Sequence, residues 1–231
     1  MTYRDLPIHE CGEPLVPVPA DRLALVQPHP YLALGAPYGE TSPFWLRRGV
    51  MARLLQAQEV LQTLRPGWRL CLYDGYRPNR VQAFMVDYTY RQLARQYPDQ
   101  PAEALWAQVY QVWAVPSDDP QRPPPHSTGA AVDVTLLDAQ GQPVDMGSPI
   151  DEPSPRSHPH YYPPHSLYGQ HRQLLFQVMT QAGLVRHPRE WWHFSWGDQL
   201  WAWVSGAGMA HYGRVEGQIA SWNTVCGNGY D

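Results

Sequence analysis

The sequence predicts one α+β domain in which helices surround a small, mostly antiparallel sheet. Three observations lead to this class. The chain has 231 residues, which suits a single domain over 1–231. Helical and extended patterns alternate irregularly and are joined by long loops. The sequence contains neither an internal repeat nor a glycine-rich phosphate loop, so repeat architectures and nucleotide-binding α/β folds are not expected.

Four segments have the pattern of helices. In the first, apolar residues recur on one face of a 3.6-residue period, at Val50, Leu54, Leu61 and Leu64. The second begins after a proline, the third carries a proline in its first turn, and the fourth ends at a glycine. We therefore expect helices over about 47–64, from 79 onward, over about 101–113 and over about 167–182.

The remaining periodic segments are short and extended. Those expected to form the main strands are 69–73, 131–137 and 191–196. Prolines punctuate the first 45 residues, and short apolar pieces at 23–26 and 31–34 predict strands in an extended arm. We place the motif-bearing core at about 30–200, with an N-terminal arm over 1–29 and a glycine-rich tail over 206–231.

Composition limits the possible partners. The net charge is −4 and no block of five like charges occurs, so nucleic acid is not an expected partner. No apolar run approaches the roughly 18 residues of a membrane span, and the first residues lack a signal-peptide pattern, so we expect a cytoplasmic protein without a membrane partner. The 3 cysteines do not form a disulfide framework, although a Cys11–Cys226 pair stays open.

The first motif with chemical content runs from His126 to Asp133. Asp133 lies inside an apolar run that is predicted to be a strand, and a buried carboxylate is costly unless a cation or metal pairs with it. His126 lies just outside that strand. Together they are suitable zinc ligands, because Zn²⁺ accepts histidine nitrogen and carboxylate oxygen. A solvent-facing loop histidine and a turn-capping aspartate are the alternative.

The second motif is Glu190-Trp191-Trp192-His193. Large aromatic neighbours exclude water, which raises a carboxyl pKa toward a value useful for a general base. His193 would be a third zinc ligand and Glu190 the base. On a regular strand these two side chains face opposite sides, so both serve one site only if the chain bends between them. A structural glutamate with a core histidine is the alternative.

The third motif is Tyr73-Asp74-Gly75-Tyr76-Arg77-Pro78. The proline restricts Arg77 to an extended backbone, which fixes the direction of its side chain. Arginine is a natural partner for a carboxylate or for a developing oxyanion, although a surface arginine is the alternative.

The three motifs together supply three zinc ligands with an open fourth position, a base and an oxyanion stabiliser, which are the parts of a metallopeptidase.

In this order and spacing, the three motifs resemble those of the VanX-type D-alanyl-D-alanine dipeptidases. This family lies in a wider group of zinc DD-peptidases that includes VanY-type carboxypeptidases and, by fold, the hedgehog domain. The resemblance implies one zinc ion per chain on His126, Asp133 and His193. It further implies that Glu190 is the general base and that Arg77 stabilises the tetrahedral intermediate of D-Ala-D-Ala hydrolysis.

Two further residues are suggested by the resemblance. Tyr31 stands where the family has a tyrosine lining the site, and Asp151 follows a stretch similar to the family's DMG segment, which makes it a candidate for contacting the substrate ammonium. One departure concerns the residues before His126, where this chain has prolines in place of the family's serines. Proline donates no hydrogen bond, so one end of the substrate is expected to be recognised differently.

Several alternatives stay open from the sequence. A D,D-carboxypeptidase acting on peptidoglycan peptides and a non-catalytic zinc-binding module use the same ligand pattern, and the oligomeric state is not indicated. His158, His160 and His165 form either a loop at the site mouth or a second metal site. A tryptophan-rich run is expected to be core, and its members are Trp191, Trp192, Trp196, Trp201 and Trp203.

Overall fold

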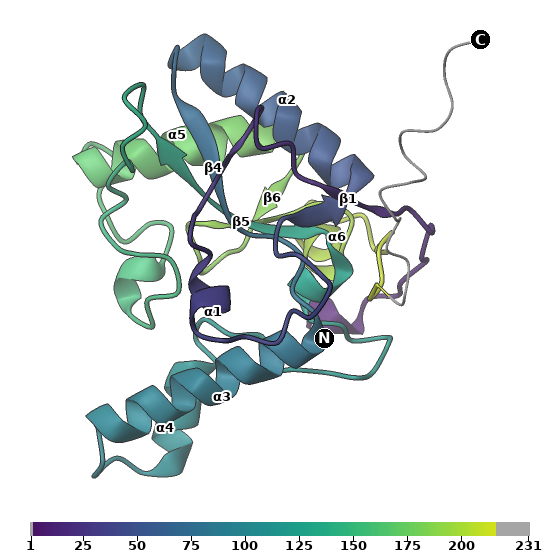
Figure 1. Ribbon diagram of the computed structural model, residues 1–231, viewed down its shortest axis with the longest axis vertical. Coiled ribbons are helices and arrows are strands. Elements are labelled where there is room, and N and C mark those ends of the chain that lie inside the picture. Colours follow the sequence, from purple (N-terminus) through teal and green to yellow (C-terminus); the bar gives the residue numbers. More distant parts are fainter. Residues whose placement is uncertain (1, 216–231) are drawn as a thin grey trace.

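A mixed five-stranded sheet lies at the centre of the computed structural model, which describes residues 2–215 (Figure 1). The strand order is β2-β4-β5-β7-β6, and the strands are β2 (Ala24–Leu25), β4 (Arg69–Asp74), β5 (Ala131–Leu137), β6 (Val185–Arg186) and β7 (His193–Ser195). β2 pairs with β4 in parallel, whereas the other three pairings are antiparallel. A separate antiparallel pair joins β1 (Leu15–Pro17) to β3 (Trp45–Arg47). The prediction of a mostly antiparallel sheet is confirmed.

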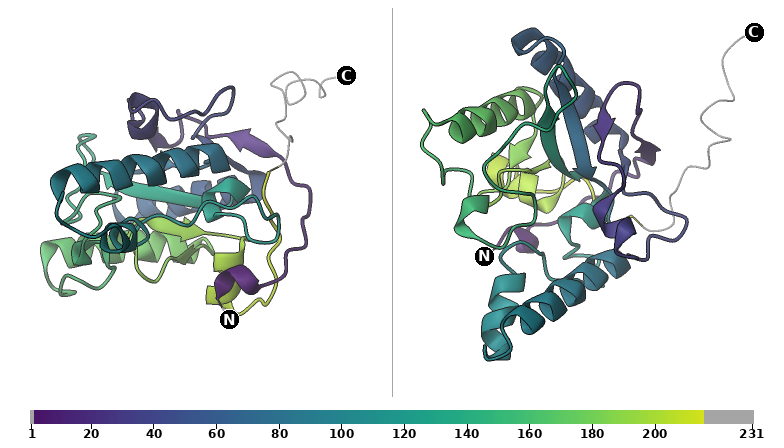
Figure 2. Two further views of the ribbon diagram at one scale, coloured as in Figure 1. Left: turned by 90° about the horizontal axis from the view of Figure 1, so that it is seen from below. Right: turned by 60° about the vertical axis from the view of Figure 1, so that its left-hand side comes forward.

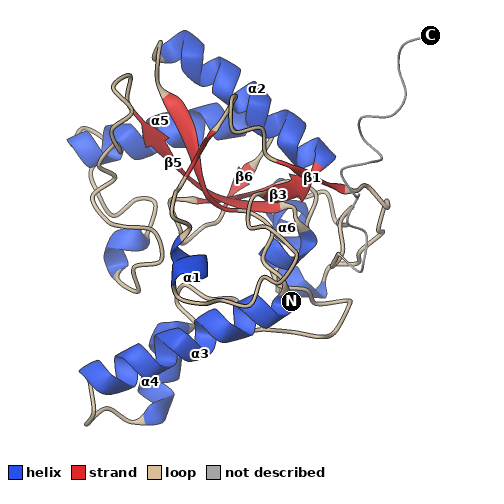
Figure 3. Ribbon diagram, viewed as in Figure 1, coloured by secondary structure: helices blue, strands red, loops and turns tan. Residues whose placement is uncertain are grey.

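Helices cover the sheet from two sides, as Figure 3 shows. They are α1 (Pro30–Ala33), α2 (Arg48–Leu64), α3 (Asn79–Gln96), α4 (Ala102–Val109), α5 (Leu167–Gln181) and α6 (Gln199–Ser205). Short 3₁₀ turns are formed by η1 (Tyr3–Asp5), η2 (Pro125–Thr128) and η3 (Pro155–Ser157). α2 and α5 lie side by side on one side of the sheet, and α3 and α4 lie on the other. Within residues 2–215, no helix is long and apolar enough to cross a membrane.

The helices enclose two separate hydrophobic cores. The larger one joins the inner faces of α2 and α5 to alternate residues of the sheet, among them Leu72 and Val134, which are 1% and 0% exposed. The smaller one lies between α3, α4 and the segment after α1, where Tyr31, Tyr38 and Trp113 are buried. The site described below lies between these two cores, so both of its walls are backed by packed side chains.

Two expectations near the site were wrong. The segment 31–34 is helical because Pro30 occupies the first turn of α1 and the His29 ring accepts a hydrogen bond from the Leu32 amide, which caps the helix. The third long helix ends at Val109, earlier than the expected 113. The chain turns there so that Trp113 enters the smaller core and its indole N–H donates to Thr89 Oγ1 at 3.0 Å.

The C-terminal part differs from expectation in one element. The strand expected at 191–196 is limited to β7, and α6 follows it, capped by Asp198, whose Oδ1 accepts from the Trp201 amide at 2.8 Å. Trp203 on α6 is 49% exposed, so its expected place in the core was wrong, whereas Trp191 and Trp192 are buried. Most of the expected glycine-rich tail, with Cys226, lies outside the described residues.

Candidate metal and catalytic site

A β-bulge brings three polar residues into one row across the sheet. Leu72 pairs with Val134, but the next pair along is Asp74 with Asp133, because the register shifts between Leu72 and Asp74. A regular antiparallel ladder would place Tyr73 opposite Asp133. Asp133 in turn pairs with His193 on β7. Directly paired residues share a face of the sheet, so Asp74, Asp133 and His193 point to the same side, away from α2 and α5.

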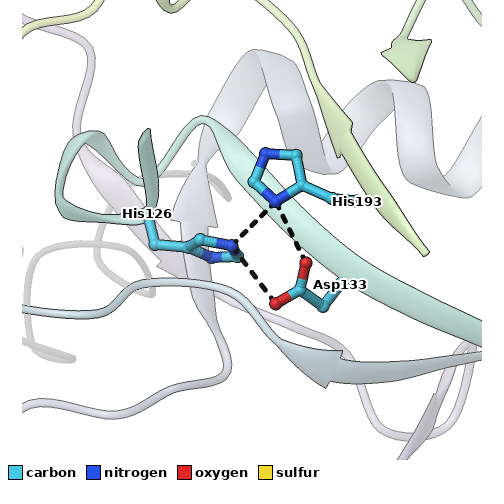
Figure 4. Close-up of side chains that lie close together, drawn as sticks. All are labelled: His126, Asp133 and His193. Carbon is cyan, nitrogen blue, oxygen red and sulfur yellow. Dashed lines mark hydrogen bonds and ion pairs between the residues drawn. The ribbon is translucent and has the colours of Figure 1, made fainter. Parts of the chain in front are cut away.

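His126 completes a three-residue cluster above this row (Figure 4). The turn η2 holds it at the end of the sheet, and Gly129, with φ +68°, redirects the chain from η2 into β5. His126 Nε2 lies 3.1 Å from His193 Nδ1 and 3.2 Å from Asp133 Oδ2. His193 Nδ1 lies 3.1 Å from Asp133 Oδ1. All three side chains are buried.

The tautomers of the two histidines show that this cluster fits a cation. His126 Nδ1 lies 2.7 Å from the Gly75 carbonyl oxygen and must donate its proton to it. In the neutral ring, Nε2 then carries a free lone pair. Ser195 Oγ donates to Asp198 Oδ2 at 2.9 Å, so at 3.3 Å it accepts from His193 Nε2, which leaves His193 Nδ1 as a lone pair. Two lone pairs and a carboxylate therefore converge on one point.

The spacing and the donor types fit zinc. Tetrahedral ligands about 2.0–2.1 Å from Zn²⁺ are about 3.3 Å from one another, close to the observed separations of 3.1–3.2 Å. The hydrogen bonds on the far nitrogens of both rings are the kind that orient metal-bound histidines. Burial would raise the pKa of Asp133, but the two histidines beside it hold that pKa well below its ordinary value, so the carboxylate is ionised.

Glu190 reaches the same site because the chain bends before β7. The strand starts only at His193, so Glu190 belongs to the turn that follows β6 and does not obey strand alternation. Its Oε2 lies 3.8 Å from His193 Nδ1 and its Oε1 lies 3.5 Å from His187 Nδ1. Burial, followed by the charges of Asp133 and Asp151, raises the pKa of Glu190 well above its ordinary value. Glu190 and His193 can therefore serve one site, although a regular strand would point them to opposite sides.

Arg77 is buried and held by several acceptors. Its Nε donates to Asp74 Oδ2 at 2.8 Å, Nη1 to Gln82 Oε1 at 3.0 Å, and Nη2 to Asp133 Oδ2 at 3.1 Å and to the Tyr31 hydroxyl at 3.3 Å. One N–H of Nη1 has no partner within residues 2–215. The guanidinium therefore has a fixed position beside the three-residue cluster, and Arg77 lines the cavity described below.

Tyr31 and Asp151 come together although they are 120 residues apart. The Tyr31 hydroxyl donates to Asp151 Oδ2 at 2.5 Å. Asp151 has φ +63°, the left-handed region that aspartate tolerates better than most residues. Burial, followed by the charge of Asp133, raises the pKa of Asp151 to about 7, while Arg77 and the Tyr31 hydrogen bond lower it.

Arg172 on α5 anchors the loop that carries Asp151, and sequence reasoning missed it. Its side chain is 2% exposed and donates to the Met146 carbonyl oxygen at 2.7 Å, to the His158 carbonyl oxygen at 2.9 Å and to Ser148 Oγ at 3.0 Å. The helical pattern of 167–182 gives no sign that one arginine points inward. The loop over 146–158 is therefore fixed by a buried cation rather than by regular secondary structure.

The cluster opens into a cavity of about 90 Å³. Its wall includes the three clustered residues, Glu190, Arg77 and Asp151, together with the turn after α4, the turn after β6 and Tyr3. Sites for drug-sized ligands typically hold about 300–1,000 Å³, so this cavity suits a much smaller molecule.

The other singled-out residues do not enter this cluster. The His158 and His160 rings are 6.2 Å apart, and His160 Nε2 lies 3.4 Å from Arg186 Nη2. Within residues 2–215, one group of metal-ligating side chains is close enough to hold an ion, and it contains neither of them nor His165. The prolines before His126 shape η2, since the Pro124 and Pro125 carbonyl oxygens accept from the Ser127 and Thr128 hydroxyls at 2.7 and 2.6 Å.

Comparison with known proteins identifies the family. Residues 25–211 match the Peptidase_M15 family model, described as D-ala-D-ala dipeptidase. A D-alanyl-D-alanine dipeptidase of Synechocystis sp. is 47% identical over 239 residues, covering 93% of this chain and 96% of that protein. A D-alanyl-D-alanine dipeptidase of Escherichia coli is 34% identical over 128 residues, 55% of each chain. The solved structure of VanYB in complex with D-Alanine-D-Alanine aligns with a TM-score of 0.45 at 15% identity, over 72% of this chain and 80% of that one. The chain belongs to the D-Ala-D-Ala dipeptidase family, Peptidase_M15.

Proposed function

We propose that this protein is a zinc dipeptidase that hydrolyses D-Ala-D-Ala to two molecules of D-alanine. The observation that carries the proposal is the convergence of two histidine lone pairs and one carboxylate at the floor of a small cavity that also holds an ionisable glutamate. Membership of the D-Ala-D-Ala dipeptidase family supports the same reaction and substrate.

His126, Asp133 and His193 hold one zinc ion, in agreement with their donor atoms and separations. When bound, zinc lowers the pKa of a coordinated water and polarises a carbonyl group. The residues of the chain do the rest of the positioning. Gly75 and Ser195 fix the two imidazole tautomers through their hydrogen bonds, and Arg77 holds the second carboxylate oxygen of Asp133.

Glu190 is the general base of this reaction. Its raised pKa makes its carboxylate a competent proton acceptor, and the same group then returns the proton to the leaving nitrogen as a general acid. Arg77 stabilises the oxyanion of the tetrahedral intermediate with the remaining N–H of Nη1, which needs no rearrangement because the other donors are already held.

A dipeptidase must recognise two free ends. Asp151, oriented by Tyr31, is the partner for the substrate ammonium, since its carboxylate lines the cavity and makes no ion pair within the described residues. The cavity volume of about 90 Å³ supports a short substrate over a longer muropeptide. Acetylation of the substrate amine removes the charge that Asp151 would pair with and adds bulk.

The test compares zinc-loaded protein on D-Ala-D-Ala and on N-acetyl-D-Ala-D-Ala. We expect hydrolysis of the free dipeptide and a kcat/KM lower by ~10³-fold for the acetylated compound, equivalent to ~4 kcal/mol. Values within tenfold of each other would favour the D,D-carboxypeptidase alternative. Retention of zinc without turnover of either compound would favour a non-catalytic zinc-binding module.

A further inference from the structure

The N-terminal segment of the chain contributes a wall to the catalytic cavity. Tyr3, in η1, lines the cavity together with Glu190, Arg189 and Pro125. Both views of Figure 2 show the N-terminal turn beside α6, and the two elements are in contact. Tyr3 also lines a small void together with Thr128 of η2, so it lies close to the turn that carries His126.

Buried hydrogen bonds hold this segment in place. Gln199, in the first turn of α6, is 3% exposed, and its Nε2 donates to the carbonyl oxygens of Arg4 at 3.2 Å, Leu6 at 2.6 Å and Gln121 at 2.9 Å. A carboxamide oxygen in this position would face three carbonyl oxygens, so the orientation of the amide is fixed. Gln199 thus ties the N-terminal segment and the loop before η2 to the same helix.

Two further contacts fasten the same segment. Arg122 Nη2 pairs with Asp5 Oδ1 at 2.9 Å, and Arg4 Nη2 donates to the Arg122 carbonyl oxygen at 2.5 Å. Backbone hydrogen bonds then join Pro7 and His9 to Ala210, both at 2.9 Å. The segment over 3–9 is therefore held along its length, which makes it a fixed wall of the cavity.

The strand order places this wall at one end of the site. Tyr31 follows β2 and Arg77 follows β4, whereas Arg189 and Glu190 belong to the turn between β6 and β7, at the other edge of the sheet. The row from Asp133 to His193 lies between them. A substrate whose ammonium meets Asp151 beside Tyr31 therefore extends its carboxyl end toward Arg189 and Tyr3.

Arg189 supplies a positive charge at that end. Arg77 and Arg189 are the cations in the cavity wall, and Arg77 is already bound to Asp74 and Asp133. The Arg189 side chain is exposed and makes no hydrogen bond or ion pair within the described residues. Pro125, which lines the cavity, has no hydroxyl or amide hydrogen to offer a carboxylate, whereas the Arg189 guanidinium has the matching charge.

We propose that Tyr3 and Arg189 form the subsite for the substrate's terminal carboxylate, with Arg189 pairing with the carboxylate and Tyr3 closing the cavity beyond it. Tyr3 thereby limits hydrolysis to substrates that end one residue after the scissile bond. This inference rests on the proposed dipeptidase function. It adds the residue, Tyr3, that limits the length of the substrate at its carboxyl end.

The test uses three variants of the full-length zinc-loaded protein and a substrate panel. Tyr3→Ala is expected to raise kcat/KM for D-Ala-D-Ala-D-Ala, relative to D-Ala-D-Ala, by about tenfold, the typical size of one lost steric or packing restriction. Tyr3→Phe keeps the ring and should leave this ratio unchanged. Arg189→Gln should raise KM for D-Ala-D-Ala about tenfold with kcat nearly constant, and should leave D-alanyl-D-alaninamide unaffected, because a charge-assisted hydrogen bond is lost.

A second readout does not depend on turnover. The rate at which a chelator such as EDTA removes zinc should rise in Tyr3→Ala and also in Gln199→Glu, where a carboxylate faces three carbonyl oxygens and releases the segment. Tyr97→Ala, at the far end of α3, is the matched control. It should change neither the rate of zinc removal, nor the ratio of kcat/KM between tripeptide and dipeptide, nor KM for D-Ala-D-Ala. Circular dichroism confirms that each variant is folded.

The outcomes separate the two proposals. Wild-type protein that hydrolyses D-Ala-D-Ala supports the dipeptidase function. If Tyr3→Ala then changes neither the ratio of kcat/KM between tripeptide and dipeptide nor the rate of zinc removal, Tyr3 does not close the cavity and only the further proposal fails. If wild-type protein hydrolyses no member of the panel, the proposed function fails, and the chelator rates still decide whether Tyr3 covers the cavity. An Arg189→Gln variant with an unchanged KM would refute the carboxylate pairing.

Discussion

The two faces of the central sheet are both covered by protein but have opposite compositions. Leu72, Val134 and their neighbours face α2 and α5 and belong to the larger hydrophobic core. On the other face, Asp74, Asp133 and His193 form one row, and each has polar partners. The first face stabilises the fold through buried apolar area. The second face buries ionisable groups, which is unfavourable unless each one is paired.

The polar face shows how such pairing is achieved. Asp74 is 0% exposed, and its carboxylate accepts from the Tyr38 hydroxyl at 3.0 Å and from Arg77, with His29 Nε2 at 3.2 Å. The Asp133 carboxylate also accepts a hydrogen bond from Arg77, but it faces the lone pairs of two imidazole rings. Asp74 is therefore satisfied by the chain alone, whereas Asp133 belongs to a cluster that could hold a metal ion. This difference separates a carboxylate with a structural role from one that belongs to the candidate metal site.

The largest expected effect comes from removing one ligand on the polar face. His126→Ala deletes one of three donors, so we expect loss of stoichiometric zinc and of activity together, measured by elemental analysis and by D-alanine release. The apolar face is untouched, so circular dichroism of the folded variant should match that of the wild type. Full zinc retention in this variant would contradict the ligand assignment.

Glu190→Gln should separate metal binding from chemistry. The amide cannot accept the proton, so kcat should fall by ~10²–10⁴-fold or more, since the same group acts first as base and then as acid. Zinc content should remain at one ion per chain because Glu190 is not a ligand. Rates near those of the wild type would exclude Glu190 from the reaction.

Leu72→Ala tests the apolar face. The side chain is 1% exposed in the larger core, and its truncation is expected to lower the free energy of unfolding by ~2–5 kcal/mol. Denaturant unfolding measures this loss, while kcat/KM per folded molecule should change little, because Leu72 points away from the site. A large loss of kcat/KM without a loss of stability would show that the two faces are not independent.

The smallest expected effect is a pH dependence from Asp151. Its raised pKa of about 7 means that the carboxyl is protonated below that pH and cannot pair with an ammonium. Bound zinc adds positive charge nearby and lowers this pKa, so the fall of kcat/KM for D-Ala-D-Ala on the acid side should set in at a pH below 7. Asp151→Asn should change that acid limb, leaving the titration of Glu190, and should raise KM for the free dipeptide. An identical pH profile in the variant would exclude Asp151.

Local patterns in the sequence determined much of this protein. The long helices α2, α3 and α5, and the strands β4 and β5, follow from apolar periodicity and from proline and glycine boundaries, which act over a few residues. Several candidate site residues could also be singled out, because a carboxylate inside an apolar strand and a glutamate among tryptophans are chemically unusual, whereas Tyr31 and Asp151 were suggested only by the resemblance to the dipeptidase family. Such signals need no knowledge of the fold.

The tertiary structure decided which of these groups meet and with what partners. The bulge in β4 sets Asp74 opposite Asp133, and strand register depends on packing across the sheet rather than on either strand alone. Tyr31 meets Asp151 across 120 residues, and Gln199 holds the Arg4 carbonyl oxygen across 195. Contacts at such separations depend on the path of irregular loops, and those loops are fixed by single buried side chains, such as Arg172, that leave no periodic pattern in the sequence.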